Sequence, residues 1–301
     1  MNETKQTEQK KHYKIIAVLI ALILILTCIS RNPTSVRALE ITGASTLGYN
    51  VIGGFTLDNG VLKNARIGVY VTHNQTDKAN YKAENAEWTH NGTSWSSGTE
   101  VLYAGSDFEQ QISAYYPYVQ GYTGTGGIEY NLTAVQTADT MKADDLMYAA
   151  ATKLNGAGTS LTFNHLMTKM KLAVTPGEEL LDGEEIAKVE IRGLAAKATF
   201  HPENGTLTTN TRTLGFTTAY YNSEEGIYEA LVFPAQYANL TIVITTSNDR
   251  VFKTTVTCPN GELLGGYQYT VALGVGQDVV NSITVTAGSW QEVTGGALEN
   301  E

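Results

Sequence analysis

Apolar and polar residues alternate in short segments along most of the chain after residue 38. In the segments 66–72 and 112–117, apolar residues stand at every second position. Alternation over about 4–8 residues, bounded by Gly, Asn, Asp and Ser, is typical of half-buried antiparallel strands. Further segments with this period or with many β-branched residues are 186–191, 241–245, 251–256, 267–273 and 282–286. Because long amphipathic helical patterns are hard to find, the sequence predicts a chain made mostly of β-strands.

The segment 161–174 changes its pattern partway along. Its apolar residues begin at odd positions, Leu161 and Phe163, and continue at even positions farther along. A strand cannot change its buried face without an additional residue, so the pattern predicts a β-bulge near His165. The alternative is that both faces of this strand are partly covered, with His165 and Met167 buried.

An acidic segment interrupts the strand pattern at 175–185. It contains five acidic residues together with one proline and two glycines, which favour loops. A change of composition of this kind marks a candidate domain boundary. Each flank is long enough for a seven-stranded sandwich of about 100 residues. We therefore expect two β-sandwich domains, 28–174 and 186–301, joined by this acidic linker.

The first 27 residues have the composition of a leader. Four lysines, at positions 5, 10, 11 and 14, precede an uncharged apolar run at 15–26. A basic region followed by an apolar run of about 7–15 residues is typical of an export signal. A membrane-spanning helix needs about 18 or more apolar residues, so a retained membrane anchor is the less favoured alternative. We expect 1–27 to be a signal peptide.

Cys28 stands where the apolar run ends. Its position resembles the lipobox of bacterial lipoproteins, in which the cysteine receives a diacylglyceryl group and becomes the mature N-terminus. The alternative is an incidental apolar cysteine within the leader. We expect lipidation at Cys28, because an unpaired cysteine is otherwise a reactive thiol in an exported chain.

Charge and cysteine content exclude several classes of function. The chain carries 30 acidic and 20 basic residues, which give a formal net charge of −10. A nucleic-acid-binding protein needs a basic surface for the phosphates, and no stretch rich in lysine or arginine occurs beyond residue 14. Cys28 and Cys258 alone cannot form a disulfide framework or a zinc site. We expect Cys258 to be buried as a small apolar residue.

The sequence contains no recognised catalytic motif. The patterns G-x-S-x-G, H-E-x-x-H and C-x-x-C and the P-loop are absent, and five histidines are scattered singly at positions 12, 73, 90, 165 and 201. Asp144 and Asp145 form a tight acidic pair outside the linker. Glycoside hydrolysis needs two carboxyl groups about 5–9.5 Å apart across a cleft, whereas neighbouring strand residues point to opposite faces. We interpret this pair as a polar turn, and we predict no catalytic residue, cofactor or metal ligand.

Tyrosine is abundant, with 17 residues in the chain. The clusters at 115–118 and 220–221 suggest a surface on which sugar rings stack, because aromatic faces bind apolar ligand surfaces. The favoured alternative is that these tyrosines pack inward and leave only the hydroxyl group in water. A surface glycan-binding lipoprotein that uses Tyr116 or Trp95 remains the alternative function.

Short motifs occur in a fixed order from about residue 40 to residue 290. Before the linker they are Ile67-Gly-Val-Tyr-Val, Ile112-Ser-Ala-Tyr-Tyr-Pro-Tyr, Asp145-Leu-Met-Tyr-Ala and Leu161-Thr-Phe-Asn-His-Leu-Met; after it they are Val189-Glu-Ile-Arg-Gly-Leu, Leu231-Val-Phe-Pro-Ala-Gln, Gly266-Tyr-Gln-Tyr-Thr-Val and Ile283-Thr-Val with Trp290. Together they resemble the fimbrillin family, the pilus subunits and pilus-like lipoproteins of Bacteroidetes. The resemblance implies a lipidated leader, two transthyretin-like β-sandwich domains and no enzymatic activity.

The resemblance also implies a way of assembling. In such pilins, a protease that cuts after arginine releases the N-terminal strand of the lipidated precursor. The groove left behind has unpaired backbone groups along an apolar seam, and the C-terminal strand of the next subunit fills it. This is strand addition, in which backbone hydrogen bonds give affinity.

Several residues of this chain match the parts of that mechanism. The segment 39–42 is the candidate for the released strand. Arg66 is the better candidate cleavage position because it directly precedes the next predicted strand, whereas cleavage at Arg37 leaves the first strand attached. The alternative for Arg66 is an ordinary surface charge at a strand end.

The C-terminal segment 279–290 is the natural donor strand. Val280, Ile283 and Val285 are its candidate apolar plugs. The alternative is an ordinary last strand that packs into its own domain. If neither arginine is cut, the chain is a non-polymerising relative: an anchor, a tip or a surface lipoprotein. The expected partners are other pilus subunits, the outer membrane through the lipid, and a host or bacterial surface ligand.

Overall fold

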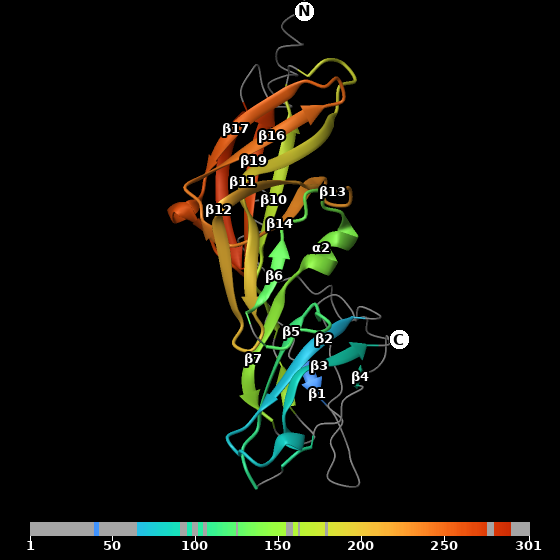
Figure 1. Cartoon of the computed structure of the whole chain (residues 1–301). Helices are drawn as coiled ribbons and strands as arrows, with labels where there is room; N and C mark the ends of the chain where they lie inside the picture. Colours follow the sequence, from blue (N-terminus) through green and yellow to red (C-terminus); the bar gives the residue numbers. More distant parts are fainter. Residues whose placement is uncertain are drawn as a thin grey trace, which may run out of the picture. The chain divides into compact units, whose positions relative to one another are not determined.

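The computed structural model describes residues 39–41, 65–90, 95–97, 102–104, 107–124, 126–154, 159–161, 163–177, 180–275 and 280–289 (Figure 1). Strands make up most of these residues, so the prediction of an all-β chain is confirmed. The helical elements within this part are short. They are the α-helix α2 (Ala138–Asp144) and the 3₁₀ turns η1 (Ala79–Tyr81) and η2 (Pro259–Gly261).

A six-stranded antiparallel sheet is built from the first half of the chain. Its strand order is β4-β3-β2-β5-β7-β9. The bounds are β2 (Arg66–Thr72), β3 (Ala83–His90), β4 (Trp95–Ser97), β5 (Gln111–Tyr116), β7 (Met147–Lys153) and β9 (Phe163–His165). The predicted strands at 66–72 and 112–117 therefore lie side by side at the centre of this sheet.

Two further sheets are built from the second half of the chain. One, the β11 sheet, has the order β12-β11-β16-β17, and the other, the β10 sheet, has the order β13-β14-β10-β19-β20. The bounds are β10 (Thr168–Pro176), β11 (Ile186–His201), β12 (Thr206–Thr218), β13 (Tyr220–Asn222), β14 (Ile227–Val232), β16 (Asn239–Thr246), β17 (Val251–Thr257), β19 (Tyr267–Val275) and β20 (Val280–Ser289). A two-stranded ladder of β15 (Ala235–Gln236) and β18 (Glu262–Leu263) stands beside them.

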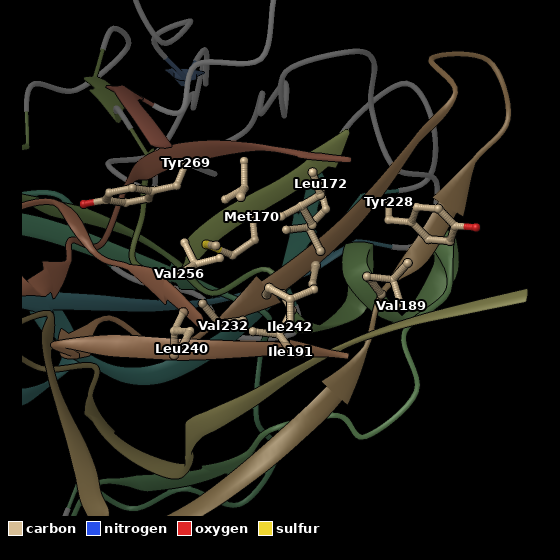
Figure 2. Close-up of a cluster of buried hydrophobic side chains, with 14 of the residues drawn as sticks. Met170, Leu172, Val189, Ile191, Tyr228, Val232, Leu240, Ile242, Val256 and Tyr269 are labelled. Carbon is tan, nitrogen blue, oxygen red and sulfur yellow. The ribbon is translucent and has the colours of Figure 1, made fainter. Parts of the chain in front are cut away.

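One apolar core holds the β11 sheet and the β10 sheet together. Figure 2 shows Met170 and Leu172 of β10 lying close to Ile191 of β11 and Ile242 of β16. All four side chains are fully or almost fully buried. Burial of each such side chain contributes about 1.5–3 kcal/mol, so this shared core makes the two sheets a β-sandwich.

The two halves of the chain interleave instead of meeting at the acidic segment. β6 (Ile128–Asn131) pairs with residues 197–200 of β11, although it lies in the first half of the sequence. β10, which the sequence interpretation assigns to the N-terminal domain, pairs antiparallel with β14 and parallel with β19. The acidic segment therefore connects β10 and β11, two strands of the same sandwich.

The chain changes sheet near His165, where the sequence pattern predicts a bulge. β9 ends at His165 in the six-stranded sheet, and β10 begins at Thr168 in the β10 sheet. The prediction of one bulged strand is therefore wrong. The shift of the apolar positions arises because the two strands bury their side chains in different cores: Phe163 packs against the six-stranded sheet, and Met170 packs inside the sandwich.

Candidate functional site

The strand ahead of Arg66 forms a ladder of its own. β1 (Leu39–Ile41) pairs antiparallel with β8 (Thr159–Leu161), and the two make a two-stranded sheet. The expectation of a strand at 39–42 is thus confirmed for Leu39–Ile41. No other strand within the described ranges pairs with β1.

An apolar cluster covers one face of the six-stranded sheet and includes the end of β8. Ile67, Val69 and Val71 of β2 supply the centre of this cluster, and Leu161 of β8 belongs to it with 1% exposure. The alternation seen in the sequence therefore marks the face that β8 helps to cover. Trp88 of β3 is buried in the same cluster, and its indole N–H has no acceptor among the described residues.

Arg66 stands at the first position of β2 and is held on several sides. Its guanidinium donates a hydrogen bond to the Glu87 carboxylate at 3.1 Å and lies 5.5 Å from the centre of the Tyr118 ring. Its backbone pairs with Thr89 of β3, and its carbonyl oxygen accepts the N–H of Tyr118 at 3.0 Å. The Arg66–Ile67 peptide bond therefore lies at the start of a paired central strand.

The predicted donor strand pairs within its own half of the molecule. β20 runs antiparallel to β19 at the edge of the β10 sheet, with Val285 opposite Val271 and Val280 opposite Val275. Both of these β19 residues are buried in the sandwich core. The alternative of a last strand packed into its own domain thus describes the arrangement in this structure.

Ile283 occupies a special position in β20. The register shifts between Ala272, which pairs with Thr284, and Leu273, which pairs with Ser282, so Ile283 has no residue opposite it. Such a β-bulge changes which face the following residues share. The bulge explains why the candidate plugs at 280, 283 and 285 do not follow a strict period of two.

Cys28 and Arg37, the predicted lipidation site and the second predicted cleavage position, lie outside the described residues. Cys258, by contrast, is 3% exposed, which confirms the expectation of a buried thiol. Burial raises the pKa of this thiol to about 11, so it is neutral and inert near pH 7.

Tyr115 and Tyr116 of the proposed sugar platform point into the protein. Tyr115 is fully buried, and Tyr116 is 7% exposed and donates its hydroxyl to the Lys142 carbonyl at 3.0 Å. Burial raises the pKa of Tyr115 to about 12. Tyr221 is half exposed and packs against Tyr228 with ring centres 4.8 Å apart. A stacking platform at 115–116 is therefore excluded, and the side chain of Trp95 lies outside the described residues.

The acidic pair takes part in the end of a helix. Asp144 is the last residue of α2 and accepts the Thr133 hydroxyl at 2.5 Å. Asp145 contacts the ring of His165 at 2.8 Å, with both side chains mostly buried. The two carboxylates thus have structural partners at a helix end, where the sequence interpretation expected a polar turn. Across the described residues, no group of three His, Cys, Asp or Glu side chains is arranged to hold a metal ion.

Within the same described ranges, no helix combines the length and the apolar character that a membrane span requires.

Comparison with known proteins identifies the family. The model of the fimbrillin-like family matches residues 56–290, which is most of the chain. The chain therefore belongs to the fimbrillin-like family. A search of curated proteins gave no match.

Solved structures share the fold. A candidate cell adhesion protein from Bacteroides uniformis has a TM-score of 0.62 and 19% identity, covering 84% of this chain and 97% of that one. A second from Bacteroides ovatus has a TM-score of 0.59 and 17% identity, covering 86% of this chain and 99% of that one. The tip fimbrial protein Mfa3 from Porphyromonas gingivalis is more distant, with a TM-score of 0.45, 10% identity and coverage of 76% and 95%.

Proposed function

We propose that this fimbrillin-like chain is a structural subunit, or an accessory tip or anchor protein, of cell-surface pili, and that it acts without catalysing a reaction. The family match over residues 56–290 supports this class of function. In this proposal the precursor is exported, acylated at Cys28 and held at the outer membrane. Neighbouring subunits then join it by donor-strand exchange.

The separate β1–β8 ladder is the observation that carries the proposal. β1 lies ahead of Arg66 and, in the described part of the chain, pairs with β8 alone. Cleavage after Arg66 therefore removes β1 and leaves the ladders of the six-stranded sheet in place, apart from the Arg66–Thr89 pair. The backbone groups of β8 then lose their partners, which is costly where the strand is buried, at Leu161. A strand from another subunit restores them.

The position of β20 supports its proposed role as that strand. It is an edge strand with one partner, β19, along the whole of Tyr267–Val275. An edge strand leaves its sheet without breaking a second ladder, as a central strand cannot. Because β20 is paired with β19 in the precursor, the precursor stays monomeric until the groove of another subunit is open. Val280, Ile283 and Val285 then serve as the apolar residues of the donated strand.

The fold supports a two-module organisation with a revised boundary. We place the change of module just before β10, because β10 belongs to the sandwich and β9 belongs to the six-stranded sheet. Both modules are transthyretin-like in this proposal. The acidic segment 175–185 is then a loop within the second module.

Treatment of the purified precursor with an Arg-specific protease tests this function. We expect ladders of SDS-resistant oligomers on unheated gels after cleavage at Arg66. The R66A variant is expected to stay monomeric, whereas R37A, the matched control, still forms ladders. Chains that are fully cut after Arg66 and remain monomeric contradict polymerisation by strand exchange.

A further inference from the structure

Three arginines of the described chain share one arrangement. Each guanidinium forms an ion pair with a glutamate and lies over an aromatic ring: Arg66 with Glu87 and Tyr118, Arg192 with Glu190 and Phe216, and Arg250 with Glu184 and Phe252. The fourth described arginine, Arg212, has no partner for its guanidinium among the described residues. It lies at 211–213, where β12 has extra residues opposite the single Ala196 of β11.

Tyr118 contacts both the backbone and the side chain of Arg66. Tyr118 donates its backbone N–H to the Arg66 carbonyl oxygen at 3.0 Å, and its ring lies 5.5 Å from the Arg66 guanidinium carbon. That oxygen belongs to the Arg66–Ile67 peptide bond. Tyr118 thus contacts both groups that an Arg-specific protease has to bind.

A protease needs these two groups free. It accepts the arginine side chain in an acidic pocket and stabilises the oxygen of the scissile bond with its own donors. In this structure, the acidic pocket of the protease has to compete with the Glu87 carboxylate and the Tyr118 ring for the Arg66 guanidinium. Its hydrogen-bond donors have to compete with the Tyr118 N–H for the Arg66 carbonyl oxygen. The pairing of Arg66 with Thr89 adds a backbone ladder that has to open as well.

We propose that Glu87 and Tyr118 form a lock that controls hydrolysis of the Arg66–Ile67 bond. The inference rests on the proposed processing at Arg66. In the locked state the start of β2 is held closed, and cleavage waits for local opening of this strand end. After opening, water hydrolyses the bond: its oxygen bonds to the Arg66 carbonyl carbon, which becomes a carboxylate as the C–N bond breaks. Its two protons pass to the Ile67 nitrogen, which becomes the new ammonium terminus. When the strand end closes faster than the protease cuts, the cleavage rate is proportional to the fraction of molecules in which this strand end is open.

The lock is tested with the full precursor and an Arg-specific endoprotease, with the new Ile67 terminus quantified by mass spectrometry. Loss of one exposed ion pair changes an opening equilibrium roughly two- to fivefold. We expect E87Q and Y118L each to speed cleavage at 66–67 by about that factor, and the double variant by about tenfold. E190Q, which removes the ion pairs of Glu190 with Lys188 and Arg192 in β11, is the control and leaves the rate at 66–67 unchanged.

Two readouts distinguish a local lock at Arg66 from a general loosening of the fold and from a failure of assembly. Cleavage after Arg250, whose guanidinium is held by Glu184 and lies over the Phe252 ring, reports general loosening in the same digests, and its rate stays constant if the lock is local. Equal rates at 66–67 in all variants, or a parallel rise in cleavage after Arg250, contradict the lock. Oligomer formation is followed separately: faster cleavage without ladders leaves the lock in place and contradicts the proposed polymerisation.

Discussion

The side chain of Gln136 takes the place of a strand partner for Leu231. Its amide nitrogen donates to the Leu231 carbonyl at 2.7 Å, and its amide oxygen accepts the Leu231 N–H at 2.7 Å. Leu231 lies in β14 beyond the three residues that pair with β13. A side chain from the first half of the chain therefore protects an edge of the sandwich.

We predict that Q136A lowers the free energy of unfolding by about 2–4 kcal/mol, because it leaves two buried backbone groups of Leu231 without partners. Urea unfolding followed by circular dichroism measures this change. Q236A is the control, since Gln236 is exposed, and it is expected to stay within about 0.5 kcal/mol of the parent. Equal stability of the two variants contradicts the edge-protecting role.

The close approach of Tyr115 to Gly68 gives a second prediction. A Cβ atom at Gly68 overlaps the Tyr115 ring and comes within 2.7 Å of the Asn85 side-chain oxygen, which accepts the Tyr115 hydroxyl. G68A therefore has to displace a buried hydrogen-bonded pair, and we expect a loss of roughly 1–3 kcal/mol.

G274A is the matched control for this substitution. Gly274 also lies in a strand, has no neighbouring atom within 4 Å of the added carbon, and does not adopt a positive φ. We expect its unfolding free energy to be unchanged or raised by up to about 1 kcal/mol. A G68A protein that unfolds at the parent urea concentration contradicts the packing account.

The buried carboxylate of Glu184 gives stability a pH dependence. It accepts hydrogen bonds from the Thr246 hydroxyl, from the Arg250 guanidinium at 2.9 Å and from the Leu181 N–H at 2.9 Å. These donors, Thr246 foremost, lower the pKa of Glu184 below its ordinary 4.5. A lowered folded-state pKa gives stability that is complete above the unfolded-state pKa and is lost as pH falls through the folded-state value.

Thermal unfolding between pH 7 and pH 3 tests the direction of this pH dependence of stability. The parent is expected to lose stability below about pH 4.5, and E184Q is expected to lose less over that interval because no carboxylate remains to be protonated. E185Q changes an exposed neighbour and should keep the parent profile. Identical profiles for E184Q and the parent contradict the assignment.

The thiol of Cys258 is expected to be unreactive in the folded protein. Burial raises its pKa to about 11, so the thiolate needed for reaction is scarce at pH 8. Labelling with an alkylating reagent, located by mass spectrometry, should modify Cys258 completely in denaturant and at least about tenfold more slowly without it. Rapid labelling of the native protein contradicts this burial.

The sequence predicts strands better than it predicts their partners. The alternation at 66–72 marks β2 because burial of one face is a local property of the strand. Either a bulge or a change of sheet would explain the change of apolar positions after Phe163, and the local sequence does not distinguish the two. The pairing of β10 with β19 across about ninety residues decides the matter, and this pairing has no local signal.

For the candidate site too, the sequence predicts the position of a residue better than its partners. The position of Arg66 at a strand start follows from the sequence, since the apolar period begins at Ile67. Its partners Glu87 and Tyr118 are 21 and 52 positions away along the chain, so only the folded sheet brings them to Arg66. Helix α2 is missed because its seven residues are too few for a helical period, although Thr137 and Thr140 form its capping box.

We propose that removal of the first strand makes this chain polymerise. Protein extracted from the cell surface can be separated into oligomeric and monomeric fractions, and the N-terminus of each determined by mass spectrometry. We expect oligomers whose chains begin at Ile67 and monomers that begin at an acylated Cys28. Oligomers whose chains still carry Leu39–Ile41, or chains that begin at Ile67 and never associate, contradict it.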